Sequence, residues 1–176
     1  MKRCPSFRCF WLVVLWLAGL PALAHEPGAH VHGTASLQVA IDGANLTLNL
    51  ESPLDNLLGF EHAPRTEKQK AAVRGMVERL NQAATLFAPT PAARCAPVSV
   101  QLDSPVLEPA KKTEGDSHAD LDGEFTFRCA SPEALHDIEV RLFDSFPNLR
   151  QLDVQVASPR GQTAPRLSPK QRRISW

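Results

Sequence analysis

The stretch that decides the fold is residues 34–51, TASLQVAIDGANLTLNLE, in which apolar and polar residues alternate on both sides of a turn. Apolar residues at every second position are typical of a strand with one buried face. The turn between the two halves is Asp42-Gly43-Ala44, so the stretch predicts an antiparallel hairpin. The alternating residues are Leu37, Val39, Ile41, Leu46, Leu48 and Leu50.

The histidine-rich segment HEPGAHVHG, residues 25–33, precedes this hairpin directly. Extending the hairpin's ladder backward places His32 near Leu54 and Asp55, because each step back on one strand is a step forward on the other. The segment therefore lies at the open end of the hairpin, where the chain departs through Ser52-Pro53.

The remaining pattern predicts an α+β fold: a mainly antiparallel sheet built from hairpins, with one long amphipathic helix and one short helix. A connection over 56–64 leads to a capping box at Thr66, and apolar residues then recur at helical spacing as far as Phe87. Further strands are predicted around Val98, Val100 and Leu102, over 124–129, around Ile138, Val140 and Leu142, and over 152–156; Ser131-Pro132-Glu133 begins the short helix. The spacing does not decide whether the tail, residues 158–176, pairs with the sheet.

Residues 1–24 predict a cleaved export signal, with a basic start, an apolar run and Ala22-Leu23-Ala24 as the cleavage site. A retained membrane anchor is the alternative, but the run Phe10–Leu20 is about half the ~20 residues that a spanning helix needs. Residues 25–176 would then be one exported domain without a membrane segment. Cleavage removes three basic residues and no acidic one, leaving 16 basic against 19 acidic residues, which gives no support to nucleic-acid binding.

Two cysteines remain after the leader, Cys95 and Cys129. In an exported protein such a pair favours a disulfide over free thiols, and a separation of 34 residues is not a metal-ligand spacing. Closing a loop of that length contributes roughly 3 to 4 kcal/mol in the chain-entropy model. We therefore predict one disulfide.

Enzyme signatures are missing from the sequence. It contains no Gly-rich phosphate loop, no GxSxG elbow and no HExxH motif, so we expect a protein that is not an enzyme. The segment at about 108–122 is polar and acidic and predicts a flexible loop.

Histidines supply the positive evidence for a metal site. Residues i and i+2 of an extended segment point to the same side, so His30 and His32 could present two nitrogens to one ion. Imidazole is a common zinc ligand, and the shell could be completed by Glu61 or His62, or by the ring and amino terminus of His25. A weaker contact in the acidic loop would use His118, Asp120 and Asp122.

Several of these motifs occur together in one known family. The run His30-Val31-His32-Gly33 before an alternating strand, the segment GFEHAP at 59–64 before a capped helix, and FTFRC at 125–129 resemble the ZrgA-like family of zinc-regulated periplasmic zinc-binding proteins. The resemblance covers essentially all of 25–176. It implies a bacterial periplasmic protein that binds zinc under zinc limitation and assists a high-affinity zinc ABC importer through its periplasmic component.

The resemblance places the family's HxHG on His30 and His32 and its GFEH on Glu61 and His62. One departure concerns residues 114–122, where the family has a long His/Asp/Glu-rich insertion and this chain has a short segment with a single histidine, His118. A single ordered site, with at most a weak loop site, therefore fits better than a high-capacity store. Two alternatives stay open: copper held by His25 with His30 or His32, and a structural or interaction module without a metal.

Overall fold

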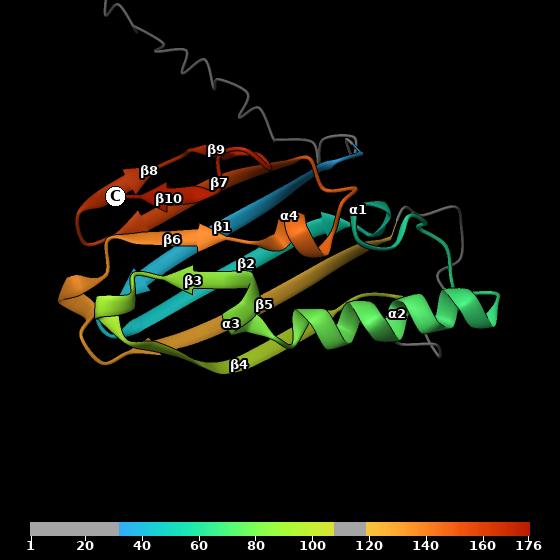
Figure 1. Cartoon of the computed structure of the whole chain (residues 1–176), viewed down its shortest axis with the longest axis horizontal. Helices are drawn as coiled ribbons and strands as arrows, with labels where there is room; N and C mark the ends of the chain where they lie inside the picture. Colours follow the sequence, from blue (N-terminus) through green and yellow to red (C-terminus); the bar gives the residue numbers. More distant parts are fainter. Residues whose placement is uncertain (1–31, 108–118) are drawn as a thin grey trace, which may run out of the picture.

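The computed structural model describes residues 32–107 and 119–176. The predicted export signal, His25, His30 and His118 lie outside these described residues. Within them, the strands form a large sheet and a small sheet, with the longest helix, α2, beside them (Figure 1). The α+β fold class predicted from the sequence is confirmed.

The predicted hairpin is the centre of the large sheet. Strand β1 (Thr34–Asp42) pairs antiparallel with β2 (Asn45–Pro53), in continuous register from Asp42 opposite Asn45 to Ser36 opposite Glu51. Gly43 sits in the turn at φ 55°, a conformation that glycine adopts without steric cost. The alternation has the predicted effect, because five of the six apolar residues are buried and Ile41 is half-buried.

The large sheet has the strand order β4-β5-β2-β1-β7-β8, and β9 also pairs with β7. The added strands are β4 (Cys95–Asp103), β5 (Asp120–Cys129), β7 (Gln151–Ser158), β8 (Gly161–Thr163) and β9 (Arg166–Leu167). Every pairing in this sheet is antiparallel except that of β1 with β7, which is parallel. The mainly antiparallel sheet is therefore confirmed, and part of the tail does pair with it.

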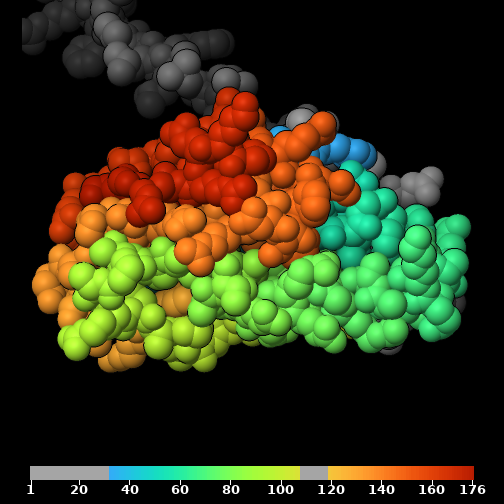
Figure 2. Space-filling view, in the orientation of Figure 1, coloured from blue at the N-terminus to red at the C-terminus, as the bar shows by residue number. Residues whose placement is uncertain are grey.

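One face of the large sheet is covered. The covering layer contains α2 (Glu67–Leu80), α3 (Ala83–Leu86), α4 (Leu142–Ser145) and the small sheet, β3 (Phe87–Pro89), β6 (Asp137–Val140) and β10 (Arg173–Ser175). Figure 2 shows this layer, which hides most of the hairpin from view. Phe87 of the layer meets Phe125 of the sheet edge to face, with ring centroids 5.0 Å apart. The other face of the large sheet carries polar side chains.

The predicted disulfide is present between Cys95 and Cys129, which are directly paired residues of β4 and β5. It ties the edge strand β4 to its neighbour. The same strand contains an irregularity between Pro97 and Ser99 that turns Val98 outward, where it is 64% exposed. Alternation had placed Val98 on one face with Val100 and Leu102; the bulge breaks that period.

Four predicted boundaries differ from the structure. The long helix ends at Leu80, where the Asn81 side chain donates to the Val77 carbonyl at 2.8 Å, and Phe87 belongs to β3. The connection over 56–64 begins inside a short helix, α1 (Leu54–Leu58), and Leu142 starts α4 where a strand residue was expected. The predicted acidic loop ends by 119, because β5 begins at Asp120. The short helices η1 and η2 span Pro91–Ala93 and Pro132–Ala134, the second matching the helix predicted from Ser131.

Candidate metal-binding corner

His32 lies between two carboxylates at the open end of the hairpin. Its Nδ1 is 3.5 Å from Oδ2 of Asp55, and its Nε2 is 3.6 Å from Oε1 of Glu61. The imidazole is 57% exposed, whereas the side chains of Asp55 and Glu61 are 29% and 16% exposed. The backward extension of the ladder, which placed His32 near Asp55, is thus confirmed. We call His32, Asp55 and Glu61 the histidine corner.

A buried asparagine fixes the backbone beside His32. Asn56, in α1, is 1% exposed, and its Oδ1 accepts a hydrogen bond from the Gly33 N–H at 2.6 Å. Its Nδ2 donates to the Thr34 carbonyl at 2.8 Å and to Oγ of Ser52 at 3.3 Å. The side chain therefore satisfies backbone groups at the start of β1 as a neighbouring strand would. This joins the helix that carries Asp55 to the strand that follows His32.

Arg150 holds the same backbone from the other side. Its Nη2 donates to the His32 carbonyl at 3.0 Å, and the backbone N–H groups of Arg150 and Gln151 donate to the Gly33 carbonyl at 2.8 and 2.9 Å. Gly33 has φ 88°, and a Cβ atom added there would overlap the guanidinium of Arg150. Glycine is therefore favoured at this position, because other residues rarely adopt this φ and because a Cβ atom would displace the end of the Arg150 side chain.

Glu61 and His62 come from the loop that follows α1. Gly59 ends the helix in the left-handed conformation, with its N–H donating to the Asp55 carbonyl at 2.9 Å, and the loop then brings Glu61 to His32. His62 stacks on Phe60, with ring centroids 5.2 Å apart, and its Nδ1 is 2.9 Å from the Ala63 carbonyl. A carbonyl can only accept, so this contact is a hydrogen bond when Nδ1 carries the hydrogen, and the neutral ring then has its lone pair on Nε2.

The arrangement of the histidine corner limits how many of its side chains could bind one metal ion. The two carboxylates face opposite ring nitrogens, which point in diverging directions, so one ion at one nitrogen cannot reach both carboxylates. Accordingly, within residues 32–107 and 119–176 no group of three or more His, Cys, Asp or Glu side chains is arranged to hold a metal ion. One nitrogen of His32 and one carboxylate would be two of the three or four protein ligands that a zinc ion takes.

Asp120 and Asp122 lie in β5, on the sheet. Asp120 is opposite Pro53, at the same end of the sheet as His32, and its carbonyl accepts a hydrogen bond from Oγ of Ser104 at 2.7 Å. Asp122 is directly opposite Glu51 of β2 and Asp103 of β4. Their predicted contact with His118 stays a prediction, because His118 lies outside the described residues.

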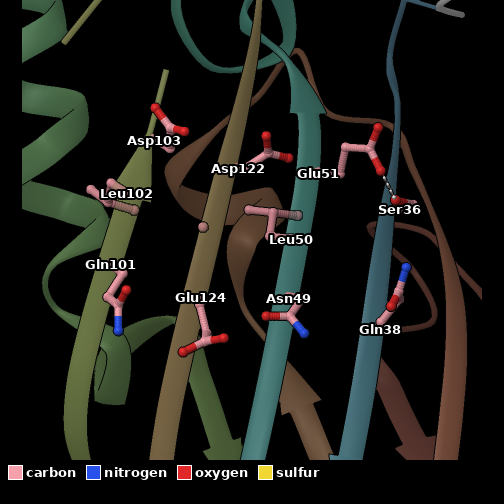
Figure 3. A pocket seen from close by; sticks show the side chains of 11 residues that line it. Ser36, Gln38, Asn49, Leu50, Glu51, Gln101, Leu102, Asp103, Asp122 and Glu124 are labelled. Atoms are coloured by element: carbon pink, nitrogen blue, oxygen red, sulfur yellow. Dashed lines mark hydrogen bonds between the residues drawn. The ribbon is translucent and has the colours of Figure 1, made fainter. Parts of the chain in front are cut away.

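We call Glu51, Asp122 and Asp103 the carboxylate row. Figure 3 shows the three side chains side by side over the polar face of the sheet, along a shallow depression of about 460 Å³. Partial burial, and then the charges of Glu51 and Asp103, raise the pKa of Asp122 above its ordinary value of 3.8. The row is therefore a place where like charges are held close together.

Sequence patterns missed one residue of the corner, Asp55, and the two residues that hold its backbone, Asn56 and Arg150. Extending the hairpin register placed Asp55 near His32, but Asp55 was not counted among the candidate ligands. Asn56 and Arg150 follow no periodicity, and Arg150 is 118 residues away from its partner His32 in the chain. An asparagine after a predicted strand end is a weak signal of a backbone clamp, and nothing local identifies Arg150.

These features define a disulfide-linked β-sheet protein with a histidine and carboxylates gathered at one sheet end. The chain belongs to the ZrgA family, since the model described as ZrgA family zinc uptake protein matches residues 29–176. The match includes the whole histidine corner, and the description is that of an uptake family and not of an enzyme family. No curated protein matches the chain. Among the described helices, none is long and apolar enough to cross a membrane.

Proposed function

We propose that this protein binds zinc as cargo in the bacterial periplasm and assists its high-affinity uptake. The observation that carries the proposal is the placement of His32, which is solvent-accessible yet held between Asp55 and Glu61 on a clamped backbone. Imidazole and carboxylate are both zinc ligands. The family's description as zinc uptake proteins supports the same cargo.

The proposed ligands are His32 and Glu61, completed by histidines near them in the chain. His62 follows Glu61 directly and has a lone pair on Nε2, and His30 lies two residues before His32. His25 is a further candidate, and His118 with Asp120 and Asp122 would form a weaker second contact. Three protein ligands would leave one position of a tetrahedral ion open to water or to an acceptor.

Ligand exchange is the proposed mechanism. An imidazole that is more than half exposed can bind an arriving ion and release it without unfolding of the sheet. The flanking carboxylates compensate part of the ion's charge while it is bound. Release would be to the periplasmic component of a zinc ABC importer, which would offer competing ligands. In this scheme the protein transfers an ion and makes or breaks no covalent bond.

Zinc titration by calorimetry tests this proposal. We expect His32→Ala to weaken zinc binding by at least about tenfold, the loss expected when a site loses one ligand or its support. His136→Ala is the matched control, because His136 is also an exposed histidine beside a carboxylate, with Nε2 3.3 Å from Oδ2 of Asp137. His136 belongs to the segment that leads into β6, away from the corner.

Two results would contradict the proposal. If the His30→Ala, His32→Ala double variant bound zinc as tightly as the parent, the ligand assignment would be wrong. A melting temperature unchanged by zinc would favour a structural module, because an ion that binds only the folded state adds about 2.7 kcal/mol at a hundredfold excess over the dissociation constant.

Adding one residue before His25 separates copper from zinc, since it would disrupt only an amino-terminal copper site.

A further inference from the structure

The peptide unit that joins His32 to Gly33 is held at both of its polar atoms. Its N–H, on Gly33, donates to Oδ1 of Asn56 at 2.6 Å, and its carbonyl, on His32, accepts from Nη2 of Arg150 at 3.0 Å. A peptide unit is planar, so hydrogen bonds on its two opposite sides fix its orientation. The Cα atom of His32 lies in the same plane, and the direction in which the imidazole leaves the backbone is thereby restricted.

Asn56 also connects this peptide unit to the helix that carries Asp55. Its Nδ2 donates to the Thr34 carbonyl at 2.8 Å and to Oγ of Ser52 at 3.3 Å, so both amide hydrogens are used within the protein. The residue before Asn56 in α1 is Asp55, whose Oδ2 lies 3.5 Å from Nδ1 of His32. One side chain thus ties the start of β1 to α1, the two elements that bring His32 and Asp55 together.

Burial and charge separate Asn56 from the residues that could touch an ion. Asn56 is 1% exposed, whereas the His32 side chain is 57% exposed. The amide is neutral, so a substitution that removes it changes no charge at the corner. Arg150 holds the carbonyl of the same peptide unit, but it is exposed and charged, and its removal would alter the electrostatic field as well. Asn56 is therefore the residue at which an effect of geometry on metal binding can be separated from an effect of charge.

We propose that Asn56 is a positioning residue of the zinc site, which holds His32 in place before an ion arrives. This inference rests on the proposed function, in which His32 is a zinc ligand. A ligand whose backbone is already ordered loses less conformational freedom when it binds, and the difference appears as affinity. Asn56 then contributes to zinc affinity without touching the ion.

Hydrogen exchange of the Gly33 amide tests the proposal without zinc. Because the Gly33 N–H donates to Oδ1 of Asn56, we expect it to exchange at least about tenfold more slowly than an unprotected amide in the zinc-free parent. In Asn56→Ala this protection should be lost, whereas the amides of β2, a strand that is paired on both sides, stay protected. The measurement shows whether the backbone beside His32 is ordered before zinc binds.

Zinc titration by calorimetry supplies the readout that a purely structural role would leave unchanged. We expect Asn56→Ala to weaken zinc binding by about 2- to 10-fold, the factor for ordering one more side chain on binding. The matched control is Ile138→Ala, which removes a buried side chain from the small sheet and also lowers the melting temperature. Its zinc affinity should equal that of the parent. Both variants are titrated at a temperature at which circular dichroism shows them to be folded.

The proposal is overturned if the Gly33 amide of the zinc-free parent exchanges like an unprotected amide. It is also overturned if folded Asn56→Ala binds zinc as tightly as the parent, or if Ile138→Ala weakens binding as much as Asn56→Ala does. Asn56→Ser, which removes the amide but keeps a polar side chain, takes the place of Asn56→Ala if the latter does not fold, with the same expected results. The proposed function fails differently, because His32→Ala would then bind zinc like the parent, whereas the exchange of the Gly33 amide requires no zinc.

Discussion

The histidine corner and the carboxylate row both gather acidic side chains near the open end of the β1–β2 hairpin, yet they are built differently. In the corner, Asp55 and Glu61 are separated by the ring of His32, which can donate to either of them. In the row, Asp103 and Glu51 both stand directly opposite Asp122, with no imidazole between them. Carboxylates in cross-strand register repel, whereas carboxylates around an imidazole are bridged by it.

The two regions also differ in how their backbones are held. The row lies on regular ladders of β2, β4 and β5. At the corner, β1 is only beginning, and the side chains of Asn56 and Arg150 replace part of a ladder. A regular ladder tolerates changes of exposed side chains, but a backbone that depends on one buried side chain does not. Substitutions in the two regions should therefore change the free energy of unfolding by different amounts and in opposite directions.

The largest effect is expected for Asn56→Ala. The substitution leaves the Gly33 N–H and the Thr34 carbonyl without their partner and opens a void where Asn56 was buried. We expect the free energy of unfolding to fall by about 2 to 4 kcal/mol in urea denaturation, since each buried group left unpaired costs about 1 to 3 kcal/mol. The matched control is Asn49→Ala, an exposed asparagine beside the row, with a change within about 0.5 kcal/mol. Similar losses of stability in both variants would show that the hydrogen bonds of Asn56 do not stabilise the backbone beside the corner.

The next effect concerns two glycines with positive φ at opposite ends of β1. Gly33→Ala places a methyl group against the guanidinium of Arg150, whereas nothing lies within 4 Å of a Cβ added at Gly43. We expect a loss of about 1 to 3 kcal/mol for Gly33→Ala and about 1 kcal/mol for Gly43→Ala, measured by thermal unfolding. Backbone conformation alone explains the smaller value, and the difference measures the contact with Arg150. If Gly43→Ala cost as much as Gly33→Ala, that contact would contribute nothing.

The same contrast explains what could be predicted from the sequence. The hairpin and the disulfide follow from alternation and from cysteine count, which are local or compositional signals, and the hairpin register extended correctly to Asp55. The parallel pairing of β1 with β7 joins segments more than 100 residues apart, and no periodicity encodes it. The bulge at Val98 and the end of α2 at Leu80 were missed because packing and capping interrupted an otherwise regular period.

For the candidate site, the sequence predicted which residue types would be ligands but not how their side chains are arranged. His32 and Glu61 lie close together, at the end of the hairpin where the sequence placed both of them, whereas Asp120 and Asp122 were assigned to a loop and lie in a strand. The clamp by Asn56 and Arg150 depends on hydrogen bonds between distant segments, which a linear pattern does not contain. The assignments of all eight candidate ligands stay predictions, and three of them, His25, His30 and His118, lie outside the described ranges. The other five are His32, Glu61, His62, Asp120 and Asp122.

The smallest effect on the free energy of unfolding is expected for Asp122→Asn in the carboxylate row. This substitution should increase stability, whereas those at Asn56 and Gly33 decrease it. The pKa of Asp122 is raised in the folded protein, so folding favours its protonated form, and its contribution to stability is lost as the pH rises from below 3.8 through that raised pKa. Asp122→Asn removes the repulsion and should therefore stabilise the protein at pH 7 by about 0.2 to 1 kcal/mol. At about pH 3 the carboxyl is largely protonated in both the folded and unfolded states, so the gain should shrink toward zero.

Urea denaturation at both pH values measures this difference, and added salt should reduce the gain at pH 7 because it screens exposed charges. Asp153→Asn is the matched control on the same sheet, since Oδ1 of Asp153 accepts a hydrogen bond from Nε of Arg166 at 2.8 Å. Its loss of an exposed ion pair should lower stability slightly, by up to about 1 kcal/mol. If Asp122→Asn also lowered stability at pH 7, the charge of Asp122 would have a favourable partner. The carboxylate row would then resemble the histidine corner, where His32 lies between the carboxylates.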